Sequence, residues 1–443
     1  MTKKLTNVQI IVIGFLLLVL IGTGLLMLPF ATVKGESTSI LTALFTSVSA
    51  SCVTGLVLVD TATHWTLFGQ IVILLLIQTG GLGLITIATL FLSFARKNLG
   101  LKNRALMAES INSDKIAGLK ELTKRILKWT LIFEGAGALL LSVPFIRDFG
   151  VLRGIYYAVF HSVSAFCNAG FDLMGIRGKF SSFETMADDY IVNLVFIALI
   201  SIGGIGFAVW EDVRINGFKL KKYSLHSKIV LSVSFVLTFG SALLFYIFEK
   251  NALFAGLPFS SAFLRSLFQS ATCRTAGFNT IDLSNLSSPS HLLSCLLMFV
   301  GGSTGSTAGG VKTSTIAVSF IFLFAGLRSQ SRPILFGRSL SVDDIKKASG
   351  VICFNASLIS AGVLIISAVQ QLSLPDVLFE VFSAMGTVGM TAGITRALAP
   401  VSKFVIIALM FLGRVGSVTL ASAFLEKRAA PRIMYPVEKI SLG

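Results

Sequence analysis

Long apolar blocks alternate with shorter polar stretches along the whole chain. The first block covers residues 9–30 without a charged side chain, and it exceeds the apolar part of a signal peptide. Seven more blocks cover roughly residues 67–95, 125–146, 189–210, 227–248, 291–327, 348–370 and 401–425. A helix needs about 20 apolar residues to cross a bilayer. The pattern therefore predicts an all-α polytopic membrane protein with eight transmembrane helices.

A short phrase separates the two blocks of each successive pair. Its copies are FTSVSASCVTG, FHSVSAFCNAG, FQSATCRTAG and FEVFSAMGTVG, and they end at Gly55, Gly170, Gly277 and Gly389. Recurrence at a long and nearly constant period indicates internal repeats. We place the repeats at residues 1–100, 101–222, 223–340 and 341–443, the last with a C-terminal tail.

Each copy of the phrase has the pattern of a short helix that runs into a small polar triplet ending in glycine. The stretch is too short to cross a bilayer, and glycine adopts backbone angles that other residues resist. Four such triplets could point carbonyl oxygens at one axis and replace the water shell of a potassium ion. The fourth copy matches the opening of the TVGYG potassium filter. The predicted filter residues are Val53, Thr54, Gly55, Asn168, Ala169, Gly170, Thr275, Ala276, Gly277, Thr387, Val388 and Gly389.

A single copy of this phrase would fit an ordinary glycine-containing loop between membrane helices, since glycine is common in such helices. Four copies in phase, with shared flanks, favour the filter. Non-helical backbone at membrane depth must be covered by protein or must line a water cavity. We therefore expect four M1–pore helix–M2 repeats in a pseudo-fourfold arrangement around a central ion pore.

A second glycine phrase lies in the later block of each repeat. It reads GGLG from Gly80, GGIG from Gly203, GGSTG from Gly301 and GRVG from Gly413. Close helix packing is enough to explain the first two copies, because small residues let helices approach in lipid.

The third copy continues into a run of glycine, serine and threonine that interrupts the block 291–327. Such residues are weak helix formers, and broken helices in transporters face the permeation path. We predict a movable gate beneath the filter, formed by Gly302, Ser303, Thr304, Gly305, Ser306, Thr307, Ala308, Gly309, Gly310 and Lys312. The run also imitates a phosphate-binding loop, but it is one residue too long and follows a membrane block.

The fourth copy places Arg414 near the middle of an apolar block. An arginine at that depth costs at least about 2.5–3.5 kcal/mol and nearly always faces a cavity or a partner. We assign it to the gate, as a fixed positive charge that limits cation flow; a snorkelling arginine is the alternative. Asp60, Asp172 and Asp282 follow the filters and would concentrate cations at an outer mouth, or would be ordinary solvated acids.

Composition and charge narrow the class further. Hydrophobic residues make up 54% of the chain and charged residues 13%, against about 25% charged in globular proteins. The net charge of +16 comes largely from connections between repeats, within residues 96–128, 214–228 and 328–347. The positive-inside rule then places both termini in the cytoplasm and the filter near the outer face. Without a basic, aromatic-rich soluble domain, nucleic-acid binding is not expected.

Chemistry other than transport finds little support. The five cysteines form neither a disulfide framework nor a metal-site spacing, and the four histidines are scattered. A membrane-embedded hydrolase or transferase would need a clustered constellation of nucleophile and base. We therefore expect no enzyme and no catalytic residues.

The motifs together resemble the Ktr/Trk/HKT superfamily of potassium transporters, and most of all the KtrB-type membrane subunits of bacterial Ktr uptake systems. The resemblance covers nearly the whole chain. It is carried by CNAGF at 167–171, RTAGF at 274–278, GTVGM at 386–390, the loop 301–312 and GRVG at 413–416.

This resemblance implies potassium uptake across a bacterial cell membrane through one pore in each subunit. It implies filter glycines at Gly55, Gly170, Gly277 and Gly389, an intramembrane gate and a pore arginine at Arg414. It further implies a homodimer in membrane lipid, no covalent cofactor, potassium as cargo, sodium as an activator or coupled ion, and a separate nucleotide-binding cytosolic ring of the KtrA type. Relatives with serine at the first filter position can favour sodium, so Gly55 favours potassium; a sodium- or ammonium-permeating transporter stays open as an alternative.

Overall fold

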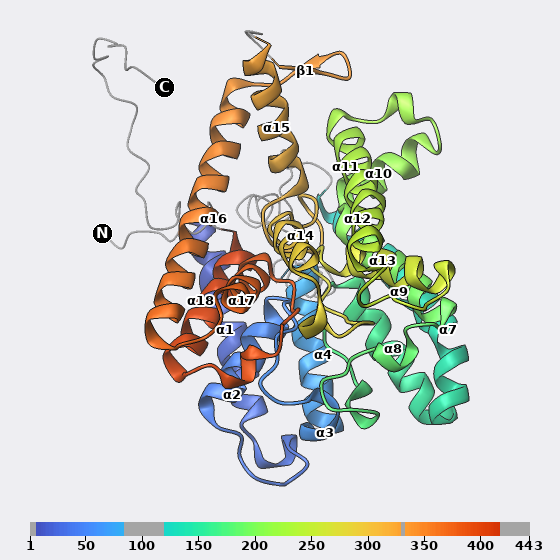
Figure 1. Ribbon diagram of the computed structural model, residues 1–443, viewed down its shortest axis with the longest axis vertical. Coiled ribbons are helices and arrows are strands. Elements are labelled where there is room, and N and C mark those ends of the chain that lie inside the picture. Colours follow the sequence, from blue (N-terminus) through green and yellow to red (C-terminus); the bar gives the residue numbers. More distant parts are fainter. Residues whose placement is uncertain (1–5, 84–118, 329–332, 417–443) are drawn as a thin grey trace.

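The computed structural model describes residues 6–83, 119–328 and 333–416, and most of them are helical (Figure 1). The first repeat contributes α1 (Asn7–Leu26), α2 (Ile40–Ser51), α3 (Thr61–His64) and α4 (Leu67–Leu82). The second contributes α7 (Leu119–Phe149), α8 (Val151–Phe166), α9 (Tyr190–Ile205) and α10 (Phe207–Asn216).

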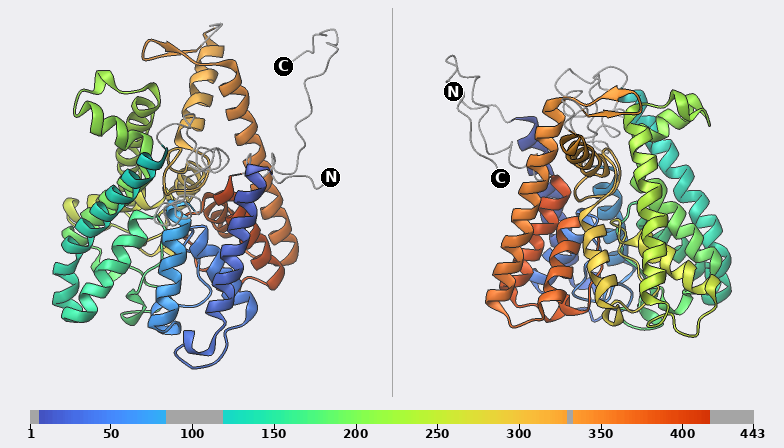
Figure 2. Two further views of the ribbon diagram at one scale, coloured as in Figure 1. Left: turned by 180° about the vertical axis from the view of Figure 1, so that it is seen from behind. Right: turned by 45° about the horizontal axis from the view of Figure 1, so that its top comes forward.

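The second half of the chain follows the same order. The third repeat contributes α11 (Leu225–Phe235), the π-helix η5 (Val236–Gly240), α12 (Ser241–Glu249), α13 (Phe259–Thr272), α14 (Ser288–Phe299) and α15 (Thr313–Leu327). The fourth contributes α16 (Val342–Val369), α17 (Leu374–Gly386) and α18 (Pro400–Val415). Strands β1 (Ile334–Leu335) and β2 (Arg338–Ser339) form an antiparallel hairpin between α15 and α16. The hairpin and the adjoining ends of α15 and α16 extend beyond the other helices (Figures 1 and 2).

The first helix of each repeat is long enough to cross a membrane. Within the described residues, four helical stretches pass this test, and they cover Gln9–Leu26, Glu121–Phe149, Leu225–Glu249 and Val342–Val369. The bent pair α9 and α10, with 95° between its halves, would make a fifth span. The expectation of eight spans is thus met in part, since the later blocks are shorter or broken.

Several expectations lie outside the described residues. They are the ends of the blocks 67–95 and 401–425, the repeat boundary at residue 100, the basic residues between 96 and 115, and most of both termini.

The opening phenylalanine of the repeated phrase anchors each short helix. Phe45, Phe160, Phe268 and Phe379 lie on α2, α8, α13 and α17, and each is at most 1% exposed. Burying such a side chain contributes about 1.5–3 kcal/mol. The phrase therefore fixes four short helices in the protein interior.

The second glycine phrase brings the later helix of a repeat against the end of its short helix. A Cβ atom built on Gly80 would collide with the carbonyl oxygen of Ser51, the last residue of α2. Gly203 has the same relation to Phe166 at the end of α8, and Gly413 to Met385 near the end of α17. Close packing is thus one role of these glycines.

Contacts between repeats form a closed circle. The second helix of one repeat packs against the short helix of the next, in the pairs α4 with α8, α9 with α13, and α14 with α17. The last repeat closes the circle, because α18 packs against α2. The ends of the short helices consequently meet in the interior.

Candidate functional site

The four predicted filter triplets share one backbone conformation. Each begins with a non-glycine residue in the left-handed region, and these are Val53, Asn168, Thr275 and Thr387, with φ of 56°, 58°, 73° and 51°. Each ends with a glycine at positive φ: 97° at Gly55, 70° at Gly170, 83° at Gly277 and 94° at Gly389. Positive φ is uncommon outside glycine. Its recurrence in one register shows that the four triplets are built alike.

The triplets also meet one another. A Cβ atom built on Gly55 would lie 2.6 Å from the carbonyl oxygen of Ala169, and one on Gly170 would lie 2.8 Å from that of Ala276. In the same way Gly277 faces the carbonyl of Val388, and Gly389 faces that of Thr54, at still closer approach. The carbonyls of Thr54, Ala169, Ala276 and Val388 therefore follow one another around a ring, and only glycine fits beside them.

Hydroxyl groups on the short helices hold the triplets in place. The Gly55 amide donates to Ser49 Oγ at 3.0 Å, and the Gly389 amide donates to Ser383 Oγ at 3.1 Å. In the other two repeats the hydroxyl is the donor, from Ser164 to the Phe171 carbonyl and from Thr272 to the Phe278 carbonyl, at 2.7 and 2.8 Å. Sequence reasoning missed this role, although each copy of the phrase carries such a hydroxyl five or six residues before its last glycine.

A cavity of about 210 Å³ lies above the glycine ends of the triplets. The three predicted acids, Asp60, Asp172 and Asp282, line it together with Glu184. Burial, together with the nearby Asp282, raises the pKa of Glu184. The acids also fix loops, since Asp60 accepts a hydrogen bond from the Thr63 amide at 2.9 Å. The cavity is an acidic mouth on the glycine side of the ring.

The predicted gate loop lies at the opposite end of the triplets. Residues 300–312 separate α14 from α15, and the Gly301 amide donates to the Val311 carbonyl at 2.9 Å to close the base of the loop. A Cβ atom on Gly309 would collide with the side chain of Thr387, the first residue of the fourth triplet. The loop therefore packs directly against the first residue of the fourth predicted filter triplet.

The same loop is bonded to the second repeat. The Ser303 amide donates to the Gly204 carbonyl at 2.9 Å, and Thr307 Oγ1 donates to the Phe166 carbonyl at 3.0 Å. In the other direction, the Phe207 amide at the start of α10 donates to the Gly305 carbonyl at 2.8 Å. These bonds join the loop to the end of α8 and to the bend between α9 and α10.

Arg414 ties the loop to the first repeat. Its guanidinium donates to the Gly81 carbonyl at 3.0 Å, and also to the carbonyls of Gly80 and Thr307. Gly80 and Gly81 lie near the end of α4, where helix carbonyls carry partial negative charge. Within the described residues Arg414 forms no ion pair with a carboxylate. Its guanidinium is held by three backbone carbonyl oxygens from two other segments of the chain.

Comparison with known proteins matches the sequence of this chain to a family model. The family model described as TrkH, cation transport protein, matches residues 3–432. The chain belongs to the TrkH family of cation transport proteins.

Relatives of this TrkH-family chain match it over its full length. The potassium/sodium uptake protein NtpJ of Enterococcus hirae is 40% identical over 100% of this chain and 98% of its own length. The Ktr system potassium uptake protein B of Bacillus subtilis is 37% identical over 99% of this chain and 97% of its own. The solved structure of the potassium transporter TrkH from Vibrio parahaemolyticus has a TM-score of 0.73 over 96% of this chain and 86% of that one, at 20% identity, and shows the shared fold.

The TrkH-family chain also encloses charged side chains to which sequence reasoning gave no role, among them Glu134, which is buried, and Arg274, which is partly buried. Glu134 on α7 accepts from Gln78 Nε2 at 3.3 Å and is 6% exposed. Arg274, directly before the third triplet, donates to Ser234 Oγ in α11 at 3.1 Å and to Thr238 Oγ1 in η5 at 3.4 Å. A charged residue within an apolar block is the signal that could have identified Glu134.

Proposed function

We propose that this chain takes up potassium ions across the cell membrane of a bacterium, as a transporter and not as a chemical enzyme. Potassium uptake is named in the Ktr and NtpJ relatives, and the chain covers them almost completely. The observation that carries the proposal is the ring of four carbonyls beside four glycines at positive φ. Such a ring can replace the hydration shell of a potassium ion, and no covalent cofactor is needed.

In this proposal the twelve predicted filter residues, 53–55, 168–170, 275–277 and 387–389, coordinate the ion through their backbone. Eight transmembrane helices, in four M1–pore helix–M2 repeats, surround the pore with pseudo-fourfold symmetry, and both termini are cytoplasmic. The shared triplet conformation and the closed circle of helix contacts support this arrangement. In this proposal the repeats are 1–100, 101–222, 223–340 and 341–443, as predicted from the sequence.

We further propose that residues 302–310, Lys312 and Arg414 gate the pore. Support comes from the place of the loop under Thr387 and from its bonds to the second repeat and to Arg414. Two relatives are named protein B of a Ktr system, which fits a system of several components. We propose that a separate cytosolic nucleotide-binding ring is such a component and acts on this loop. A homodimer in membrane lipid, and sodium as an activator or coupled ion, complete the proposal.

The main alternative is a sodium- or ammonium-permeating transporter of the same architecture. The name of the NtpJ relative, which includes sodium, favours sodium as the second candidate. Gly55 favours potassium over sodium as the transported ion. A serine at this position would place its Cβ atom 2.6 Å from the Ala169 carbonyl oxygen, at a φ of 97°. That carbonyl would have to move, and the ring would lose the geometry that suits potassium.

Ion flux into liposomes tests the proposal. With the purified full chain, rubidium uptake should be competed by potassium more strongly than by sodium or ammonium. Gly55→Ser should lower the preference for potassium over sodium by at least about fivefold. Gly35→Ser is the matched control, because Gly35 has a φ of 69° but open space around it. Equal competition by sodium in the wild type would favour the alternative, and absence of ion flux would reject both.

A further inference from the structure

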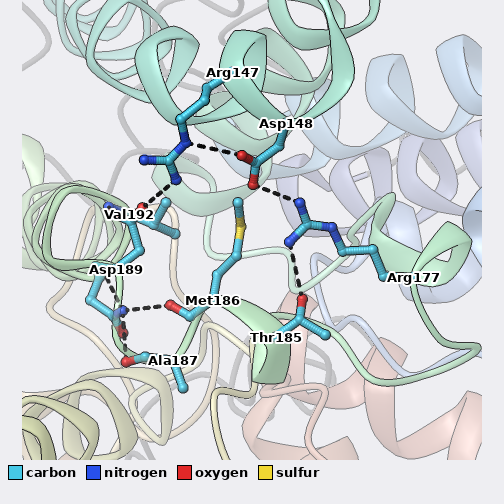
Figure 3. Close-up of polar contacts among 9 residues, drawn as sticks. Arg147, Asp148, Arg177, Thr185, Met186, Ala187, Asp189 and Val192 are labelled. Carbon is cyan, nitrogen blue, oxygen red and sulfur yellow. Dashed lines mark hydrogen bonds and ion pairs between the residues drawn. The ribbon is translucent and has the colours of Figure 1, made fainter.

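The segment 177–183, here called the outer strap, crosses the mouth of the proposed pore. Its first residue is anchored within the second repeat, where the Arg177 guanidinium donates to Asp148 at 2.6 Å and to Thr185 Oγ1 at 3.4 Å (Figure 3). Asp148 is also paired with Arg147, which in turn pairs with Asp189 at the start of α9 (Figure 3). The first residue of the outer strap is thus held by a hydrogen bond and a chain of ion pairs.

Further along, the outer strap contacts the other three repeats. The Phe180 amide donates to Asp60 of the first repeat at 3.2 Å. Ser182 Oγ accepts from the Asn279 amide of the third repeat at 3.2 Å, and the adjoining Phe183 amide donates to the Asn279 carbonyl at 2.8 Å. On the fourth repeat, the Arg396 guanidinium lies 4.0 Å from the centre of the Phe180 ring. Contacts on all sides hold Phe180 and Ser182 at positive φ, 65° and 45°.

Arg396 is a positively charged residue in the lining of the cavity. It lines the acidic cavity with Asp60, Asp172, Glu184 and Asp282. Within the described part of the chain it forms no ion pair with any of these carboxylates, and its guanidinium stacks on Phe180 instead. Stacking on a ring keeps an arginine in place without neutralising its charge. The cavity is therefore lined by one guanidinium, stacked on a ring, as well as by four acids.

We propose that Arg396 determines the affinity of the transporter for its cation, by opposing the carboxylates that draw cations into the mouth. This inference rests on the proposed function. A cation in the cavity is attracted by the acids and repelled by the guanidinium, so the occupancy of the mouth reflects the balance. Phe180 acts as the positioning residue, because its ring holds the guanidinium over the cavity.

The test is a charge series at Arg396 in the full chain, with rubidium uptake into liposomes as the readout. Arg396→Gln should lower KM about two- to fivefold at low ionic strength with Vmax unchanged, the size expected for one charge across a water-filled cavity. Arg396→Glu should lower it further, and Arg396→Lys, which keeps the charge, should stay close to wild type. Impermeant salt should shrink these differences, since the screening length falls from about 30 Å at 0.01 M to about 10 Å at 0.1 M.

The outcomes separate this inference from the proposed function. Wild-type liposomes without rubidium uptake would contradict the proposed function itself. Uptake with the same KM for Arg396→Lys, Arg396→Gln and Arg396→Glu would overturn the role of Arg396. A KM change that high salt leaves in place, or that Arg396→Lys shares with Arg396→Gln, would also overturn it, because it would reflect lost packing on Phe180.

Discussion

The filter triplets of the four repeats can be compared with the breaks in their second helices. The triplets share one conformation in all four repeats. The second helices do not all end in the same way. Three of them end at a single glycine, Gly83, Gly206 or Gly416, with φ of 85°, 99° and 91°. In the third repeat, residues 300–312 take the place of that glycine. A ring around an ion needs the same group from every repeat, whereas obstruction of the path needs only one segment.

The largest effect is expected at the ring of carbonyls, where one added methyl group should make the conformation of one triplet differ from that of the other three. Gly389→Ala brings Cβ against the Thr54 carbonyl, so potassium-selective flux should fall at least about tenfold. Rubidium uptake in liposomes measures this. Gly393→Ala is the matched control, because Gly393 has a φ of 103° with nothing within 4 Å. It should cost about 1–2 kcal/mol of stability and leave selectivity intact. Equal selectivity of both variants would argue against a tight carbonyl ring.

The next effect is expected at the gate. Arg414→Ala removes the donors that join Thr307 in the loop to Gly80 and Gly81 in the first repeat. Flux through the protein without any partner should rise about tenfold, the factor that corresponds to about 1.4 kcal/mol of lost charge-assisted hydrogen bonding. Liposome flux at several voltages provides the measurement.

Arg414→Lys distinguishes two explanations of that rise. Lysine keeps the positive charge but cannot span three carbonyls as a planar guanidinium does. If the bridge holds the loop, the lysine variant should leak as the alanine variant does. Flux as low as wild type for lysine would instead indicate that charge alone limits the pore, and unchanged flux in both variants would contradict a gate at this position.

A smaller effect is expected from the hydroxyls that brace the triplets. Ser383→Ala removes the acceptor of the Gly389 amide, and a net hydrogen bond contributes about 0.5–1.5 kcal/mol. The potassium-to-sodium flux ratio should fall about two- to fivefold, with Ser49→Ala giving a similar loss through Gly55. Ser360→Ala on α16, whose exposed hydroxyl bonds only its own helix, serves as the control. A rubidium flux reduced more by Ser383→Ala than by Gly389→Ala would contradict the greater importance of the space beside Gly389.

Much of the fold could be predicted because apolar blocks and repeated phrases are local signals. The block 348–370 corresponds to α16, which begins six residues earlier, at Val342, because Ser341 caps it. A search for apolar residues does not detect this first turn, since it is polar. The short helices and triplets followed from the repeated phrase. The stops at Gly83 and Gly206 did not, since a glycine that permits close packing and one that ends a helix look alike in sequence.

The four triplets could be predicted because each copy of the phrase supported the others, and they share one backbone conformation. That they bind an ion stays a prediction. The partners of Arg414 could not be found in this way, since its carbonyl acceptors in α4 lie more than 300 positions away in the chain. Likewise, nothing in the sequence links Phe180 to Arg396 before the loops are placed around one mouth.

The circle of helix contacts closes between α18 and α2, at opposite ends of the sequence. During synthesis, this contact therefore forms only after the first three repeats have been made. If the chain forms the proposed pore, its conduction path is complete only after α18 has docked onto α2. A chain that ends before α18 would then have no enclosed channel.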